Sequence, residues 1–97
     1  MIKPTIGRVV WYHPSEFDRT PMTLHGEVLA AIIVHVWSDT YVNLTVFDSN
    51  GTPHARTSVQ LLQDGDPNRP SAYCEWMPYQ KGQAAKTEQL EAKLAGA

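Results

Sequence analysis

Polar residues with the chemistry to bind an anion gather in two neighbouring runs of this chain. Arg56 lies between His54 and Ser58 in an alternating run of strand length. Asn43 lies at the same level of the preceding run. An anionic or nucleotide-like ligand would meet three kinds of polar group there. They are the Arg56 guanidinium, the hydroxyls of Thr57 and Ser58, and the Asn43 amide. The alternative, a solvated strand face, stays equally open.

Aromatic side chains are frequent for so short a chain, and several end a predicted strand beside a loop. Nucleobases stack on such rings with about 1–3 kcal/mol per base. Trp11 and Trp76 alternate with apolar residues, which favours core positions for both. The predicted ligand-binding residues, including arginines placed to meet phosphate, are Arg8, Tyr12, His13, Arg19, Trp37, Asn43, Arg56, Thr57, Ser58 and Trp76.

The sequence assembles no catalytic or metal-binding motif. The four histidines and the single cysteine fall at no spacing that places two metal ligands on one turn. Cys74 alternates with Ala72 and Trp76, which predicts a buried, inert thiol. Residues 64–66 begin like a calcium loop, but the later ligands and the closing Glu are missing, which favours a solvated turn. We therefore predict a binding protein without metal or cofactor, with a nucleotide-signal hydrolase left open.

Length and charge limit the class of protein. Ninety-seven residues form one domain whose single core leaves little surplus stability, so that a partner subunit would help. The net charge is −2, and the eight Lys and Arg are not clustered, which argues against long nucleic acid as a partner. The longest apolar stretch, residues 28–34, is too short to span a bilayer, and the N-terminus lacks a signal core. These features predict a cytoplasmic protein with no membrane partner.

Five runs of strand length precede a helix-forming tail. The expected strands are residues 6–13, 28–37, 41–48, 54–62 and 72–79, and a short helix is expected at 84–94. Residues 38–40 and the pair Asn50-Gly51 supply turn chemistry between runs. Residues 14–27, with two prolines, form a long loop of the kind that is more often functional than merely connective.

Alternation within the runs predicts which side chains face the core. The third run places Val42, Leu44 and Val46 inward. The fourth is expected to place Ala55, Thr57, Val59 and Leu61 inward and His54, Arg56, Ser58 and Gln60 outward. Residues 28–37 are apolar on both faces as far as His35, which predicts a central strand covered on both sides.

The pattern as a whole predicts a mainly β fold. We expect a small five-stranded, SH3-like antiparallel barrel over residues 1–80 and a C-terminal helix or tail over residues 81–97. The two apolar faces of residues 28–37 exceed what one short chain covers comfortably, which predicts at least a dimer.

Short segments spread over residues 3–79 carry a family resemblance. They are residues 3–12, 30–34, 37–39, 42–48, 50–51 and 57–59, followed by Trp76 and Pro78. Together they resemble a widespread family of small, mostly uncharacterised phage and prophage proteins, whose usual ending has a Trp-x-Trp-Pro pattern. This chain departs from that ending, because Cys74 stands at the first aromatic position. The resemblance implies a phage-encoded protein that acts in the cytoplasm of the infected bacterium.

Size, aromatic content and arginines also make the chain similar to phage sponges that sequester nucleotide signals of bacterial immunity. This analogy of class implies a non-catalytic homo-oligomer that binds a cyclic nucleotide in an anti-defence role. The alternative is an SH3-like interaction module that docks on a host or virion protein. A nucleotide that raises the thermal stability of the protein would separate the two hypotheses.

Overall fold

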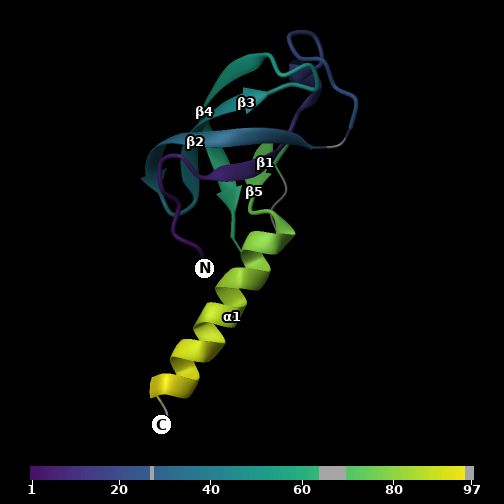
Figure 1. Ribbon diagram of the computed structural model, residues 1–97. Coiled ribbons are helices and arrows are strands. Elements are labelled where there is room, and N and C mark those ends of the chain that lie inside the picture. The colour runs from purple at the N-terminus through teal and green to yellow at the C-terminus, as the bar shows by residue number, and fades with distance from the viewer. Residues whose placement is uncertain (27, 64–69, 96–97) are drawn as a thin grey trace.

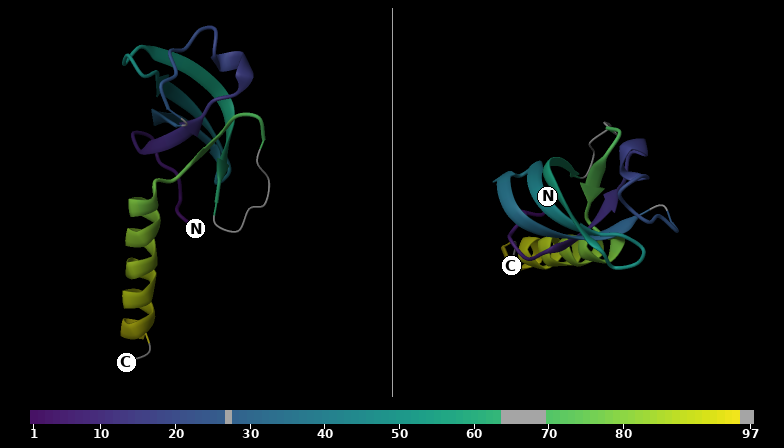
Figure 2. Two further views of the ribbon diagram at one scale, coloured as in Figure 1. Left: turned by 90° about the vertical axis from the view of Figure 1, so that its right-hand side faces the viewer. Right: turned by 90° about the horizontal axis from the view of Figure 1, so that it is seen from above.

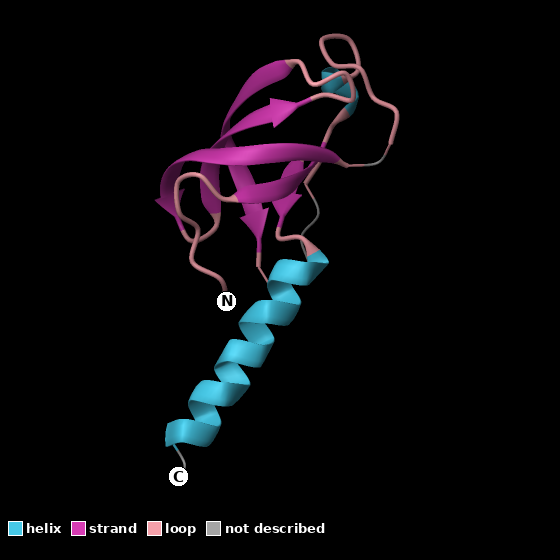
Figure 3. Cartoon of the chain, in the orientation of Figure 1, coloured by secondary structure: helices cyan, strands magenta, loops and turns pink. Residues whose placement is uncertain are grey.

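The computed structural model describes residues 1–26, 28–63 and 70–95, and within them five strands form a closed barrel (Figure 1). The elements are β1 (Val9–His13), the 3-10 helix η1 (Glu16–Asp18), β2 (Leu29–Ser38), β3 (Tyr41–Phe47), β4 (Pro53–Leu62), β5 (Tyr73–Glu75) and α1 (Pro78–Ala95). Figure 3 shows the strands gathered in one body from which α1 projects. The predicted mainly β fold, with a five-stranded barrel and a C-terminal helix, is confirmed.

The barrel closes through one parallel seam. β1 pairs antiparallel with β2 and β5, and the β2–β3 and β3–β4 pairs are also antiparallel. β4 and β5 run parallel, with Leu61 opposite Cys74 and Leu62 opposite Glu75. The predicted antiparallel pairing therefore holds for every pair except β4 with β5. A parallel pair needs a longer connection than a tight hairpin, and turn signals between the runs predict hairpins alone.

Side-chain alternation builds the core of the barrel. Val42, Leu44 and Val46 of β3 are buried, as predicted, and pack with buried residues of the other four strands. In β2 only the inner face is covered, since Val34 is 45% exposed and Ala30 is exposed. The prediction that residues 28–37 are covered on both sides is wrong for the chain by itself.

A bulge in β4 changes the predicted register. Leu44 lies opposite Arg56, and the next pair of the ladder skips a position, so that Thr57 and Ser58 face the single residue Asn43. Ser58 has a φ of 53°, a left-handed conformation that serine adopts only under constraint. One extra residue in a strand turns every side chain before it to the other face.

The outward placement predicted for Arg56 and His54 is therefore wrong. Both lie on the inner side of β4, opposite buried β3 residues, whereas Ala55 and Thr57 are exposed. Val59, beyond the bulge, is buried as predicted. The bulge thus turns two half-buried polar side chains to the inner side of β4.

The C-terminal helix starts earlier than predicted. α1 begins at Pro78, a residue that fits the first helical position because its missing N–H has no partner there anyway. β5 correspondingly ends at Glu75 instead of continuing to residue 79. Gln80 fastens the first turn, since its Nε2 donates to Val9 O at 2.9 Å and its Oε1 accepts from Met77 N at 2.8 Å.

Beyond that first turn, α1 extends away from the barrel, as the left view of Figure 2 shows. Its Tyr79 and Leu90 side chains are 74% and 61% exposed. In the described part of the chain, no helix combines the length and apolar character needed to cross a membrane.

Candidate functional site

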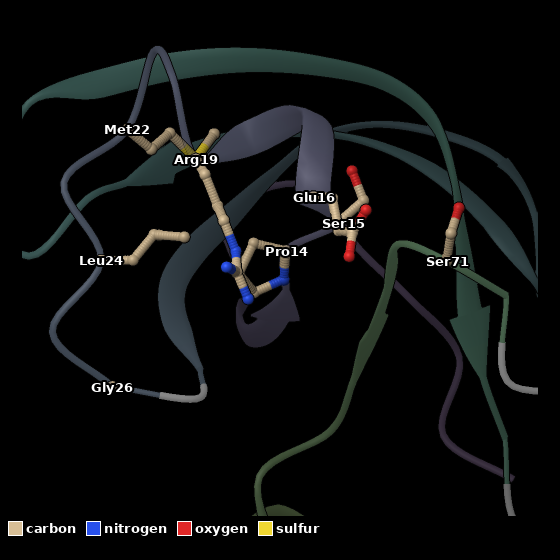
Figure 4. Close-up of a pocket in the computed structure, with 8 residues that line it drawn as sticks. All are labelled: Pro14, Ser15, Glu16, Arg19, Met22, Leu24, Gly26 and Ser71. Carbon is tan, nitrogen blue, oxygen red and sulfur yellow. The ribbon is translucent and has the colours of Figure 1, made fainter.

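A pocket of about 790 Å³ lies where the chain leaves β1 (Figure 4). Its lining consists of Pro14, Ser15, Glu16, Arg19, Met22, Leu24, Gly26 and Ser71. All of these except Ser71 belong to the long loop between β1 and β2, which the sequence predicted as functional. The volume falls within the range of about 300–1,000 Å³ that small-molecule sites occupy.

The pocket has one apolar and one polar side. Met22 is 4% exposed and belongs to the barrel core, and Leu24 packs against that core. Ser15 and Glu16 lie on the other side, at the start of η1. Figure 4 shows the Arg19 side chain extending across the pocket toward Pro14.

The two charged side chains of the pocket are available to a ligand. Arg19 is exposed, and within the described residues its guanidinium has neither a hydrogen bond nor an ion pair. The Glu16 carboxylate is likewise exposed and unpaired in that part of the chain. A guanidinium binds phosphate or carboxylate through paired hydrogen bonds, and a carboxylate accepts from hydroxyl or amino groups.

Asp18 fixes the first half of the loop from inside the barrel. Its side chain is buried, and its Oδ2 accepts from Tyr12 Oη at 2.7 Å and from Ser15 N at 2.9 Å. Its Oδ1 accepts from Arg56 Nε at 2.9 Å and lies 2.8 Å from Arg56 Nη2. The Ser15 and Asp18 pair forms a capping box on η1, which holds the polar rim of the pocket in place.

Titration behaviour follows from this cluster. Burial raises the pKa of Asp18, but hydrogen bonds from Tyr12, Ser15 and Arg56 outweigh burial and hold that pKa below its usual value. Burial and the adjacent carboxylate raise the pKa of Tyr12, so its hydroxyl stays protonated and donates a hydrogen bond to Asp18. Asp18 is therefore an ionised, fully paired structural group.

Asp48 fixes the second half of the loop from the β3–β4 turn. Its carboxylate lies 3.0 Å from His54 Nε2 and accepts from the backbone N–H groups of Asn50, Thr52 and Thr23 at 2.9, 3.0 and 3.3 Å. The hydrogen bond with His54 and those backbone donors lower the pKa of Asp48 to about 2. Because Thr23 belongs to the long loop, this carboxylate ties the loop to the barrel a second time.

The structure separates the predicted ligand-binding residues into several places. Arg19 alone of the ten lines this pocket. Tyr12 is 2% exposed and Arg56 is occupied by Asp18, so both support the loop from within. Trp76 is 1% exposed and therefore a core residue, with the Arg8 guanidinium 5.9 Å from its ring centroid.

Four other predicted residues do come together, on the outside of the barrel. Asn43 Oδ1 accepts from Trp37 Nε1 at 2.9 Å and from Ser58 N at 2.8 Å, and Thr57 is exposed beside Ser58. His13 lies apart from them and stacks on Tyr73 with ring centroids 4.3 Å apart. The convergence on Arg56 that the sequence suggested is therefore replaced by a cluster around Asn43.

Sequence reasoning missed the pocket neighbours of Arg19. Glu16, Met22 and Leu24 sit in a segment without periodicity, and nothing local indicates which way each one points. The Ser15 and Asp18 spacing is the one signal that marks the short helix around which they are arranged.

Neither the thiol of Cys74 nor a metal site adds a reactive group to this pocket in the described part of the chain. Cys74 is fully buried, as predicted, and burial raises the pKa of its thiol to about 12. Among the described residues, no three His, Cys, Asp or Glu side chains gather in a way that could hold a metal ion.

The structure is a small closed β-barrel with a pocket formed mainly by its first long loop. Comparison of the chain with protein-family models, with curated proteins and with solved structures returned no match in any of the three. The resemblance to phage and prophage proteins therefore stays an expectation, and the function must be argued from the pocket.

Proposed function

We propose that this protein is a non-catalytic binding protein that holds a small anionic, nucleotide-like ligand in the pocket beside Arg19. The observation that carries the proposal is the placement of Arg19. An arginine without a partner in the described part of the chain extends across a pocket of about 790 Å³ that is apolar on one side and polar on the other.

Each part of such a ligand has a complementary group in the lining. The Arg19 guanidinium suits a phosphate, which it can contact with two parallel hydrogen bonds. The apolar side, where half-buried Leu24 packs on the core beside buried Met22, suits the flat face of a base. The Glu16 carboxylate suits ribose hydroxyls, as an acidic residue does in many dinucleotide sites.

The charge of the lining favours ligands with few negative charges. Arg19 is the one cation in this lining among the described residues, so it can pair with the single charge of a phosphodiester but would leave most of the charge of a triphosphate unpaired. Cyclic nucleotides carry one charge per phosphate, and sequestration of such a signal is the specific form of this proposal. That specific form draws on the phage resemblance, whereas the binding of a nucleotide rests on the pocket.

A thermal-shift screen tests the proposal. The panel contains cyclic mono-, di- and trinucleotides, cyclic ADP-ribose isomers and linear nucleoside monophosphates. A ligand at a hundred times its dissociation constant should stabilise the protein by about 2.7 kcal/mol. If no member of the panel shifts Tm, the proposal is wrong, and the SH3-like interaction module is favoured.

Calorimetric titration of variants with the best ligand locates the site. Arg19→Ala should weaken binding by roughly tenfold to a hundredfold, because a charge-assisted hydrogen bond contributes about 1.5–3 kcal/mol. Arg8→Ala is the matched control, since Arg8 is also exposed but lies outside this pocket. Equal affinity of Arg19→Ala and the unmodified protein would remove Arg19 from the site.

A further inference from the structure

The seam between β4 and β5 covers only the end of β4. β5 lies opposite Leu61 and Leu62, whereas β3 accompanies β4 from Pro53 to Gln60. On the side away from β3, residues 53–59 therefore have no strand neighbour in the described part of the chain. We call this side of residues 53–59 the open edge. Unpaired N–H and C=O groups along such an edge are a template on which another strand can pair.

The register of the β3–β4 ladder shows which backbone groups face the open edge. Asp48 N donates to Thr52 O, in the same register as the pairs that follow it. In an antiparallel ladder, every second residue turns its backbone groups toward the same neighbouring strand. The even-numbered residues 52–56 therefore bond to β3, and the odd-numbered residues 53–57 turn their backbone groups to the open edge.

Several of the groups that a regular strand would offer here are missing or occupied. Pro53 has no N–H to donate. Ala55 O already accepts a hydrogen bond from Arg56 Nη1 at 2.7 Å. Ser58 N, at the bulge, donates to Asn43 Oδ1 at 2.8 Å. An incoming strand would therefore find an incomplete ladder.

Arg56 connects the open edge to the long loop. Its side chain lies on the inner side of β4, where Nε and Nη2 lie 2.9 and 2.8 Å from Asp18 Oδ1. The remaining terminal nitrogen, Nη1, is the atom that reaches Ala55 O. One planar guanidinium thus holds η1 beside β4 and also occupies a carbonyl of the open edge. Because Asp18 is buried, opening this contact would leave its charge without a cation.

We propose that Arg56, held by Asp18, is a guard that blocks strand addition by a second copy of this chain at the open edge. Natural sheets protect their edges with proline, with bulges and with charged side chains that point inward. All three features fall within residues 53–58. A dimer that buried the outer side of β2 would leave the guard in place.

The guard and the nucleotide pocket share no lining residue. The test of the guard uses no ligand, so each proposal can fail without the other.

Sedimentation velocity of the full chain and of Arg56→Ala over a micromolar concentration range tests the guard. The weight-average mass of Arg56→Ala should rise with concentration to at least twice that of the unmodified protein, because the variant frees the Ala55 carbonyl and releases η1 from β4. The infrared amide I band should gain the low-frequency component typical of strands paired between molecules.

Thr57→Lys in the Arg56→Ala background is the rescue variant. Thr57 is exposed, and a lysine there places a charge on the open edge without restoring the contact with Asp18. The double variant should return to the mass of the unmodified protein. Ile33→Ala is the control for lost stability, since Ile33 is fully buried in β2, away from the open edge. It should keep the mass of the unmodified protein under conditions in which circular dichroism shows both single variants folded.

If Arg56→Ala does not fold, Arg56→Lys takes its place. Lysine keeps a charge beside Asp18 but lacks the planar fork that reaches both oxygens, so this variant should associate in the same direction to a smaller extent. Three results would overturn the proposal. They are an unchanged mass for the folded Arg56 variant, equal association of Ile33→Ala, and association that Thr57→Lys does not suppress.

Discussion

Two buried carboxylates hold the pocket loop, and they do so from opposite directions. Asp18 belongs to the loop and reaches into the barrel, where Arg56 and Tyr12 bind it. Asp48 belongs to the barrel and reaches out to the loop, where it accepts from the Thr23 backbone. The first carboxylate depends on one charged side chain, and the second is shared among several backbone donors and a histidine.

We call these two contacts between barrel and loop the Asp18 tether and the Asp48 tether. The difference in partners determines how each of them can be lost. Removing Arg56 leaves the Asp18 charge buried with no cation, which is costly. Removing the Asp48 charge weakens several moderate hydrogen bonds at once, and those donors lie at a turn where water can replace the carboxylate. We therefore expect the Asp18 tether to respond most to mutation and the Asp48 tether to respond to acid.

The largest expected effect comes from Arg56→Ala. It should lower the free energy of unfolding by about 2–3 kcal/mol, less than the roughly 3–5 kcal/mol for breaking a fully buried ion pair, because Arg56 is partly exposed. Urea unfolding followed by circular dichroism measures this. Arg19→Ala is the control and should change stability by less than about 0.5 kcal/mol, since Arg19 has no partner in the described structure. Equal stabilities of the two variants would contradict a structural role for the Arg56 pair.

The next largest effect should be a loss of stability in acid that comes from Asp48. Its pKa is lowered from the ordinary 3.8 to about 2, so the unfolded chain takes up this proton first as the pH falls. The stabilisation is complete above the ordinary pKa and disappears as the pH falls through the lowered one. Asp48→Asn should therefore flatten the dependence of Tm on pH between about 4 and 2.

The pH profile of Asp48→Asn should not become entirely flat, because the pKa of Asp18 is also lowered. Asp39→Asn, at an exposed turn position, is the control and should keep the profile of the unmodified protein. If Asp48→Asn kept that profile as well, Asp48 would not be a source of the acid sensitivity.

The smallest effect in this comparison should come from Tyr12→Phe. The change removes the hydroxyl that donates to Asp18 at 2.7 Å but keeps the buried ring. We expect a loss of about 1–1.5 kcal/mol, because Ser15 and Arg56 still satisfy the carboxylate. Tyr79→Phe, on the exposed side of α1, should leave the urea midpoint unchanged. A loss as large as that of Arg56→Ala would show that the hydroxyl, and not the cation, is the main partner of Asp18.

The sequence predicted the barrel well where alternation is uninterrupted. The alternation in β3 predicted that Val42, Leu44 and Val46 face the core, and all three are buried. The prediction succeeds because successive side chains of an uninterrupted strand point to opposite faces. The bulge at Ser58 was not foreseeable, since no glycine marks it and its backbone N–H is satisfied by Asn43 on another strand. That single extra residue reversed the predicted placement of Arg56.

The pocket was predictable only in outline. Loop length and the arginine at position 19 pointed to the correct segment. The shape of the loop, however, depends on contacts such as that of Asp18 with Arg56, whose partners are far apart in sequence. Local patterns do not record such pairings, so the lining of the pocket became visible only in the folded chain.

The short closing strand has a consequence for the order of folding. β2, β3 and β4 follow one another through short connections, whereas β5 joins β1 and β4 with three residues and brings distant parts of the chain together. Long-range pairing must overcome the entropy of closing a large loop before it yields many contacts. We expect the three-stranded meander to form the folding nucleus and the β5 seam to close last, so that pulse-labelled amides of β5 gain protection after those of β3. Earlier protection of β5 would contradict this order.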